Sequence, residues 1–501
     1  MAPQKLNKIQ FIITITLLVL LMVQTMTSFI HLPPLEGVIV ETEMPKLTYA
    51  NMMDGNFQNG FEEYGRDHFG FREWLIPLYN QFEWDLFKKV ERRDIFFGKD
   101  NWLYFVETVQ DHYETITFNY VSDPEELVKI FQKEAMKVYY LQELLKEYGT
   151  TLFICIAPSK NEVYPEYLPE NTSWFHEGGI RAEEWYAQKF QELGVNCLNL
   201  QHVFKAIKRE VSYPLFYKNS SHYSYIAATY AADTLVKFME ETSGLNIQNF
   251  TFKKEEVQEA KKIDRDLEEL FNLIRPIERN MKYYYVGIDP IPDSTAVKPR
   301  WLTIGDSYYW GISEELRAAN IFDISPFWYY GKTVHFDYWD SDPQVSNHNI
   351  ADELIEADIV MLLWCPRNLY VLENGILNNT LLSLSIHDNY NSWIQDKIKN
   401  QTELYNDIVE KAKENSRTIE EQIQLDSDWI LDQEIQKYFN LEQVAPPTIR
   451  NERIANLGVW FKGKTPEEIC KIKHNYRSLK KTRIDDADTL MKEAVQMLYQ
   501  K

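Results

Sequence analysis

The sequence predicts a doubly wound α/β fold built on a parallel sheet. Three apolar runs, at 150–158, 301–304 and 357–364, carry this prediction because they are rich in β-branched and aromatic residues. A strand that is apolar on both faces is typical of a buried parallel sheet. Amphipathic helix patterns separate the runs, and strands that alternate with helices indicate a sheet with helices on both sides. We place this sheet between residues 120 and 375.

The expected elements follow one another from residue 61. Residues 61–90 carry an apolar stripe of helical spacing that ends near Phe87. The stretch "DIFFGKDNWLYFV" then predicts a hairpin that turns at Gly98, and a long amphipathic helix is expected over 124–148. Gly149 follows that helix as a C-cap. The remaining expected elements are a helix over 180–193, a short strand over 195–200 and a helix over 221–241.

An apolar segment over residues 9–30 predicts a membrane helix, because about 20 such residues cross a bilayer. Lys5 and Lys8 precede it, and this basic flank favours a cytoplasmic N-terminus. No convincing cleavage site follows, so we expect an uncleaved, single-pass signal anchor over residues 1–31 in the inner membrane. A cleaved signal peptide is the alternative. In either case we expect the rest of the chain in the periplasm or another extracytoplasmic space.

Three further segments are expected after the anchor. Residues 32–60 are typical of a stalk, because Pro33, Pro34 and Pro45 interrupt any helix. Residues 61–384 hold the α/β domain. Residues 385–501 change to charged helical patterns and form a helical C-terminal extension, which serves either as a docking module for a partner or as plain packing helices.

The net charge of −22 argues against a nucleic-acid partner, since no compact basic patch offsets it. The four cysteines form no Cys-x-x-Cys pair, so neither a zinc ribbon nor a redox motif is expected. Cys155 and Cys365 are expected to be buried thiols, with a Cys155–Cys197 disulfide as an open alternative. His335 and His348 lack the partner pattern of a metal site, and neither a metal nor a cofactor is expected.

The chemistry-bearing stretch is Gly305-Asp306-Ser307, directly after a predicted strand. In an α/β sheet, functional groups gather beyond the carboxyl ends of the strands. We expect Gly305 to permit a sharp turn and Asp306 to bind local amides. A serine needs a base to become a nucleophile, and His222, just before a predicted helix, is the candidate. Taken alone, Asp-Ser after a strand is a common turn and a histidine near a helix start is usually structural.

Several stretches in a fixed order carry a resemblance. Together they cover about residues 60–375 and resemble the SGNH-hydrolase-like proteins of the alginate O-acetyltransferase group. The resemblance implies an SGNH-hydrolase-like (flavodoxin-like) fold with a permuted motif order, in which the histidine precedes the serine. The stretches are "FGFREWLIPLYN", "FFGKDNWLYF", "APSKNEVYPEYLP", "FYKNSSHYSYIAA", "LTIGDSY" and "EADIVMLLWCPRNL".

The resemblance implies that Ser307 carries the acyl group and that His222 is its general base. Two positions depart from the family: Ser220 stands where the family has an acid two residues before the histidine, and Tyr223 stands where it has a tryptophan after the histidine. Three readings stay open, namely an acid from elsewhere, a Ser-His dyad, or an impaired site. Asp264 and Asp266 are the candidates for a relocated acid; a solvated helix start is the plain alternative for both.

Further residues are expected around the cleft. The backbone amide of Ser307 or Tyr308 is a candidate oxyanion donor. Arg367 and Asn368 end a strand at the same edge and are candidates for substrate or oxyanion contacts. Lys160 is a weaker candidate, because a loop lysine is more often solvated.

Three functions follow from this reading. The first is an O-acetyltransferase that acts on an extracytoplasmic polysaccharide and receives acetyl groups from a multi-pass membrane O-acyltransferase. The second is a polysaccharide O-acetyl esterase with water as acceptor. The third is a catalytically weakened scaffold or polysaccharide-binding subunit, which the serine at position 220 makes credible.

Overall fold

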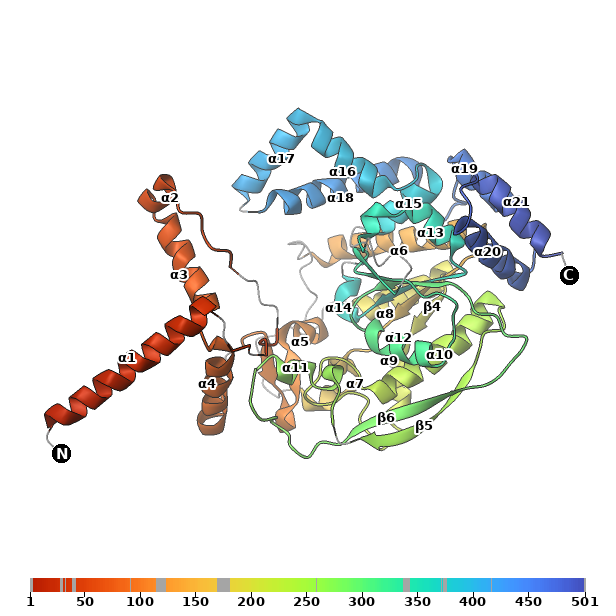
Figure 1. Ribbon diagram of the computed structural model, residues 1–501. Coiled ribbons are helices and arrows are strands. Elements are labelled where there is room, and N and C mark those ends of the chain that lie inside the picture. The colour runs from red at the N-terminus through yellow and green to blue at the C-terminus, as the bar shows by residue number, and fades with distance from the viewer. Residues whose placement is uncertain are drawn as a thin grey trace. The chain divides into compact units, whose positions relative to one another are not determined.

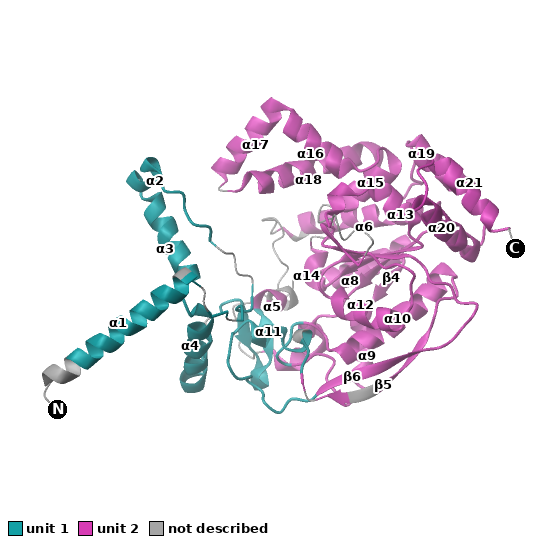
Figure 2. Ribbon diagram, in the orientation of Figure 1, with its two compact units in different colours: residues 1–105, 218–221, 260–282 teal, residues 106–217, 222–259, 283–501 magenta. Residues whose placement is uncertain are grey.

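The structure is a computed structural model (Figure 1). It describes residues 3–27, 30–31, 33–37, 42–90, 92–113, 123–168, 181–257, 259–336, 343–370, 372, 376–415 and 417–499. The chain divides into two compact units, which Figure 2 shows in different colours. Unit 1 holds residues 1–105, 218–221 and 260–282, and unit 2 holds residues 106–217, 222–259 and 283–501.

Unit 1 is mostly helical, with a small hairpin. The predicted hairpin is confirmed: β1 and β2 pair antiparallel, with the turn at Lys99–Asn101. The helical stripe over 61–90 begins in one helix and continues in another, because Phe71 has a left-handed φ of 63° and separates α3 from α4. The elements of this unit are α1 (Pro3–Thr27), α2 (Tyr49–Met53), α3 (Asn56–His68), α4 (Arg72–Phe87), β1 (Ile95–Phe97), β2 (Leu103–Phe105) and α11 (Asp266–Glu269).

One described helix, α1, is long and apolar enough to cross a membrane, within Lys8–Thr25. A signal anchor and a signal sequence both have these features. The expectation of one apolar helix near the N-terminus is therefore confirmed.

Unit 2 is built on a six-stranded sheet with strand order β4-β3-β10-β7-β8-β9. The strands from β4 to β8 run parallel, and β9 pairs antiparallel to β8 at one edge. All three predicted apolar runs are strands of this sheet. Its strands are β3 (Thr151–Ile156), β4 (Cys197–Asn199), β7 (Trp301–Gly305), β8 (Phe327–Tyr329), β9 (Thr333–His335) and β10 (Ile359–Trp364).

Helices cover both faces of this sheet. On one face, Leu152, Ile154 and Leu302 join a large core to which α6, α8, α13 and α15 contribute. On the other face, Phe153 contacts Phe238 of α10, with ring centroids 5.5 Å apart. The doubly wound α/β prediction is therefore confirmed. The helices around the sheet are α5 (Val106–Tyr113), α6 (Pro124–Lys146), α7 (Lys160–Val163), α8 (Ala182–Leu193), α9 (Leu200–Ile207), α10 (Tyr225–Ser243), α12 (Tyr309–Ala318), α13 (Ile350–Glu356), α14 (Pro366–Leu369) and α15 (Leu377–Ser385).

An antiparallel ribbon of two strands, β5 (Phe250–Val257) and β6 (Tyr283–Pro290), adds to unit 2. The sequence did not predict it, since the centre of β5 is charged. The four cysteines are free thiols, so the Cys155–Cys197 disulfide is not formed.

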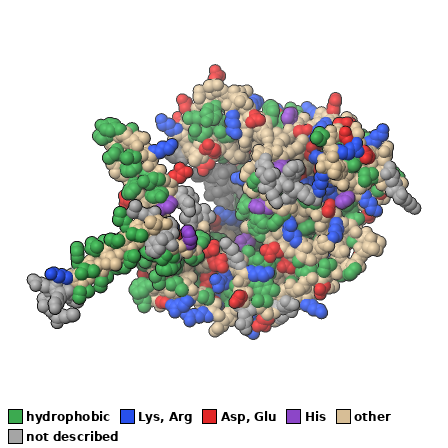
Figure 3. All heavy atoms as spheres, viewed as in Figure 1, with side chains coloured by type: hydrophobic (Ala, Val, Ile, Leu, Met, Phe, Trp, Pro, Cys, Tyr) green, Lys and Arg blue, Asp and Glu red, His purple; other side chains and the backbone are tan. Residues whose placement is uncertain are grey.

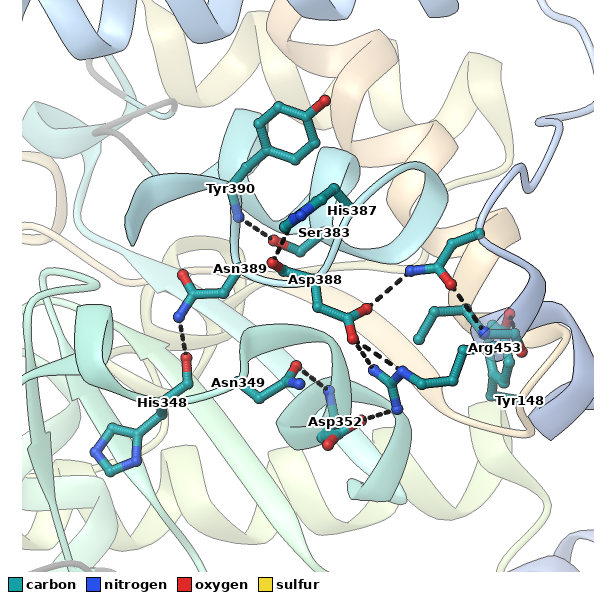
Figure 4. Close-up of polar contacts among 12 residues, drawn as sticks. Tyr148, His348, Asn349, Asp352, Ser383, His387, Asp388, Asn389, Tyr390 and Arg453 are labelled. Carbon is teal, nitrogen blue, oxygen red and sulfur yellow. Dashed lines mark hydrogen bonds and ion pairs between the residues drawn. The ribbon is translucent and has the colours of Figure 1, made fainter. Parts of the chain in front are cut away.

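The C-terminal region is helical, as expected, and shares the main core with the sheet. Arg453 donates to Asp352 (2.7 Å) and to Asp388 (2.8 Å), and Asn389 donates to the carbonyl of His348 (2.5 Å), as Figure 4 shows. These contacts join α13, the segment before α16, and α19. The helices are α16 (Tyr390–Asn400), α17 (Thr402–Glu414), α18 (Ile419–Tyr438), α19 (Glu452–Val459), α20 (Pro466–Lys480) and α21 (Ala487–Met497).

Helix α20 fastens this region to the amino ends of the central strands. The buried Lys473 donates to the carbonyl of Ala357 (2.7 Å) and to Oγ1 of Thr150 (2.8 Å), next to the starts of β10 and β3. Arg477 donates to the carbonyl of Glu356 (2.7 Å). Burial lowers the pKa of Lys473 to about 8. These contacts pack α20 against the sheet of unit 2.

Candidate active site

Ser307 follows β7 at the carboxyl end of the sheet, where an α/β fold gathers its functional groups. The distance between Nε2 of His222 and Oγ of Ser307 is 2.9 Å. His222 stands just before α10, whose first turn is capped by the side chain of Ser224. The structure thus brings together the two residues that sequence motifs nominated, although 85 positions separate them.

Gly305 is required for a reason other than the expected sharp turn. It is the last residue of β7 and lies in register with Leu363 of β10. A Cβ on Gly305 would lie 2.3 Å from the carbonyl oxygen of Leu363. Its backbone is not among the positions with positive φ. The close approach of β10 therefore demands glycine here.

The buried carboxylate of Asp306 braces the turn that carries Ser307. One oxygen accepts from the backbone N–H of Tyr308 (3.0 Å). The other accepts from the backbone N–H of Cys365 and from Nδ2 of Asn368, both at 2.8 Å. The expected bond to a local amide is present, and two further bonds tie the turn to the end of β10.

Two tyrosines hold the histidine and the serine in place. The Tyr308 ring lies 4.9 Å from the His222 ring, measured between centroids. The hydroxyl of Tyr223 donates to the backbone carbonyl of Tyr308. Burial raises the pKa of Tyr223 well above its usual value, so this phenol stays a neutral donor. The tyrosine at the position of the family's tryptophan therefore braces the turn that carries Ser307.

The two candidate oxyanion donors differ in the hydrogen bonds that they already make. The backbone N–H of Tyr308 donates to Asp306, as described above. Within the described part of the chain, the backbone N–H of Ser307 makes no hydrogen bond. Of the two predicted amides, the one of Ser307 is thus open to a negatively charged oxygen.

The predicted residues at the end of β10 have partners of their own. Arg367 forms an ion pair with Glu107 of α5 (2.7 Å) at a partly exposed position. The side chain of Asn368 is bound to Asp306. Lys160 is 4% exposed and lies in α7, so it is buried rather than solvated.

In unit 1, the segment directly before His222 is fixed at four consecutive positions, 218–221. The carbonyl of Lys218 accepts from Leu103 (2.7 Å), and the carbonyl of Asn219 accepts from Glu268 (3.2 Å). The other two positions are held by the segment that carries the candidate acids. Ser220 donates through Oγ to the carbonyl of Ile263 (2.5 Å), while Ser221 donates to Asp266 through its N–H (2.7 Å) and Oγ (2.5 Å).

The two candidate acids differ in their surroundings within unit 1. Asp264 is 1% exposed, and one of its carboxylate oxygens accepts from the N–H of Lys261 (3.1 Å). Asp266 is half-buried, and both of its oxygens accept from Ser221. The roles of Asp264 and Asp266 stay a prediction. No cluster of three or more metal-binding side chains occurs among the described residues.

A comparison with protein families gives one result. Residues 95–287 match the ALGX family. It is described as an SGNH hydrolase-like domain of the acetyltransferase AlgX, so the predicted resemblance is confirmed. The matched segment contains His222, Asp264 and Asp266 and ends before Ser307.

Solved structures with similar folds are distant in sequence. The O-acetyltransferase domain of Pseudomonas putida AlgJ is 14% identical, with 56% of this chain and 93% of that chain covered and a TM-score of 0.36. Pseudomonas aeruginosa AlgX is 12% identical, with 57% and 66% covered and a TM-score of 0.39. Bacillus cereus PatB1 is 13% identical, with 55% and 96% covered and a TM-score of 0.35. No curated protein sequence matches. These likenesses are too low to carry a substrate over to this chain.

Proposed function

We propose that this chain is an O-acetyltransferase that moves acetyl groups onto hydroxyls of an extracytoplasmic polysaccharide through an acetyl-serine intermediate. The observation that carries the proposal is the 2.9 Å contact between His222 Nε2 and Ser307 Oγ at the carboxyl end of the parallel sheet. A serine that is hydrogen-bonded to an imidazole is the arrangement that nucleophilic catalysis needs.

The reaction divides into two balanced halves. His222 Nε2 takes the proton of Ser307 Oγ as the oxygen attacks the carbonyl carbon of the acetyl donor. When the tetrahedral intermediate collapses, the bond to the donor oxygen breaks and His222 returns the proton to that oxygen. A sugar hydroxyl then attacks acetyl-Ser307, with His222 taking and returning a proton in the same way.

The backbone N–H of Ser307 supports this chemistry as the oxyanion donor. It is open among the described residues, whereas the N–H of Tyr308 is held by Asp306. One oxyanion donor is typically worth about 3 to 4 kcal/mol in the transition state. In this proposal neither Arg367 nor Asn368 contacts the oxyanion. Asn368 acts through Asp306, and Arg367, paired with Glu107, is a charge at the rim of the site.

The acid in this proposal comes from the segment that contains Asp264 and Asp266. The support is that Ser220 and Ser221, which precede His222 in the chain, are bound to Ile263 and Asp266. Asp264 is the preferred candidate for the acid because its carboxylate is almost fully buried. If Asp264 is the acid, Asp264→Asn should lower kcat about 100-fold or more. If Ser307 and His222 work as a dyad without an acid, the same substitution should leave kcat unchanged.

The proposed setting is the outer face of the inner membrane. In this setting α1 is the anchor, and a multi-pass O-acyltransferase supplies acetyl groups from across the membrane. The apolar character of α1 supports the anchor. The polysaccharide acceptor is proposed from the family resemblance alone.

The division of acetyl groups between water and an added sugar tests the proposal. The purified protein is given a chromogenic acetyl ester with and without an added oligosaccharide, and both acetate and acetylated sugar are measured. We expect acetylated sugar to form in preference to acetate, and Ser307→Ala to abolish both products. Ser313→Ala in α12 is the matched control. Acetate as the only product would instead indicate an esterase, and no product from a folded wild type would indicate a scaffold.

A further inference from the structure

Helix α4 of unit 1 has two faces of opposite character. On one face, Nδ2 of Asn80 donates to the carbonyl of Phe271 (2.8 Å), and the Trp84 ring stacks on Phe97 with centroids 5.5 Å apart. Gln81, on the same side, is buried. This face therefore fastens α4 to the rest of unit 1.

The other face of α4 is mostly apolar and exposed to the surroundings; its one acidic side chain, Asp85, pairs with Arg275. The apolar side chains of this face are between 43% and 60% exposed, and at 100° per residue they span an arc of roughly 140°. Hydrophobic side chains gather over α4 as they do over α1 (Figure 3). A patch of this kind marks an interaction surface. We call it the α4 stripe, and it consists of Trp74, Leu75, Leu78, Tyr79, Phe82 and Leu86.

The α4 stripe begins next to the last turns of α1. The backbone N–H of Gly70 donates to Oγ1 of Thr25 (2.7 Å). A Cβ on Gly70 would lie 2.5 Å from the carbonyl oxygen of Leu21, so the two segments are in close contact. Helix α4 begins two residues later, at Arg72. If α1 crosses the bilayer, its C-terminal end lies at the outer interface, and α4 starts at that level.

From these contacts we infer that α4 lies along the outer surface of the bilayer, with the α4 stripe in the boundary between lipid headgroups and acyl chains. The inference rests on the anchor proposed for α1. A helix that exposes one broad apolar face, while its other face packs on the rest of the protein, can take this position. Its 16 residues extend about 24 Å along the membrane.

The chemistry of α4 favours a lipid surface over a protein partner. Trp74 and Tyr79 are the residue types that concentrate at membrane–water interfaces. Lys88 and Lys89, both exposed, follow the stripe directly, as suits anionic headgroups. The bilayer is already next to the start of α4 through α1, whereas a protein partner would have to be recruited to it.

Depth-dependent fluorescence quenching tests the inference in the full chain. The protein carries Leu78→Cys with a polarity-sensitive dye and is reconstituted in vesicles of phosphatidylcholine and phosphatidylglycerol. The lipids bear a nitroxide either near the headgroup or near the chain end. The matched control is Ile484→Cys, because Ile484 is fully exposed in unit 2. The unsubstituted protein measures background labelling of its own thiols, three of which are buried.

The expected result is that the shallow nitroxide quenches the dye at position 78 at least about twofold more than at position 484. Equal quenching at the two positions, in protein that still floats with the vesicles, overturns the inference and leaves the anchor intact. Stronger quenching by the deep nitroxide overturns it by indicating a spanning helix. Quenching at position 78 that appears only after a second membrane protein is added to the vesicles overturns the inference in favour of protein docking. Failure to float overturns the anchor itself. Phe82→Cys repeats the measurement in case the first label disturbs the helix.

Discussion

Asp306→Asn tests whether the Asp306 carboxylate holds the turn that carries Ser307. The carboxylate accepts three hydrogen bonds, one from Tyr308 and two from the end of β10. An amide has one oxygen and one NH2 group. In either orientation, the NH2 group of the asparagine therefore points at an N–H donor that a carboxylate oxygen accepts from in the wild type. The cheaper orientation keeps the oxygen toward Cys365 and Asn368 and turns the NH2 group toward the N–H of Tyr308.

The cost of this change follows from the contacts. A hydrogen bond to a charged group contributes about 1.5–3 kcal/mol, and a neutral one contributes about half as much. The variant loses one charge-assisted bond and weakens two, at a position that is fully buried. The free energy of unfolding should therefore fall by about 3 kcal/mol. Because the bond to Tyr308 shapes the turn at Ser307, kcat should fall about 100-fold.

Two assays check these numbers on the purified protein. Urea unfolding measures the stability, and initial rates with an acetyl ester measure kcat. Asp233→Asn is the matched control, since Asp233 forms a surface pair with Lys237 (2.7 Å) that is worth at most about 0.5 kcal/mol. An Asp306→Asn protein with wild-type stability and rate would refute the assignment of Asp306 as a brace.

Three other changes have defined outcomes. Gly305→Ala should destabilise the fold by about 3 kcal/mol or more, because its Cβ would collide with the carbonyl oxygen of Leu363; a variant that unfolds at the wild-type urea concentration argues against the close approach. Tyr223→Phe removes the phenol that donates to the carbonyl of Tyr308 and should cost about 1–3 kcal/mol and about tenfold in kcat; the same ester assay measures the rate, and an unchanged kcat argues against a role for Tyr223 as a brace. Burial raises the pKa of Glu183 to about 7, so its protonated form stabilises the fold below pH 4.5 and that contribution is lost as the pH rises through 7. Glu183→Gln should remove a stability difference of up to about 3 kcal/mol between pH 4.5 and pH 7. Urea unfolding at both pH values measures this, and an equal change in the free energy of unfolding for the wild type and the variant would contradict it.

Much of the fold followed from the sequence because the central strands are apolar on both faces. The runs that form β3, β7 and β10 could be assigned as strands from local sequence alone. The β5–β6 ribbon was missed because "FTFKKEEV" has no clear alternation of apolar and polar residues and because 25 residues separate β5 from its partner strand. Strands β8 and β9 have three residues each, which is too short for a periodic signal.

The candidate site was predicted in part. Chain order and local motifs nominated Ser307 and His222, and the structure places their reactive atoms in contact. The bonds from Asp306 to the end of β10 carried no local signal, because the partners lie about 60 residues downstream. Tyr223 was seen only as a replacement for tryptophan, since its acceptor is a backbone carbonyl that no sequence pattern marks.

Detection of an acetyl group on Ser307 tests the proposed acetyl-enzyme mechanism directly. The protein is mixed with an acetyl ester, quenched with acid within one turnover, digested, and analysed by mass spectrometry of the peptide that contains "GDSYYW". We expect a transient acetyl group on Ser307 that disappears when an oligosaccharide is added and that does not form in His222→Ala. Turnover of the ester without acetyl-Ser307, or with the acetyl group on another residue, would contradict it.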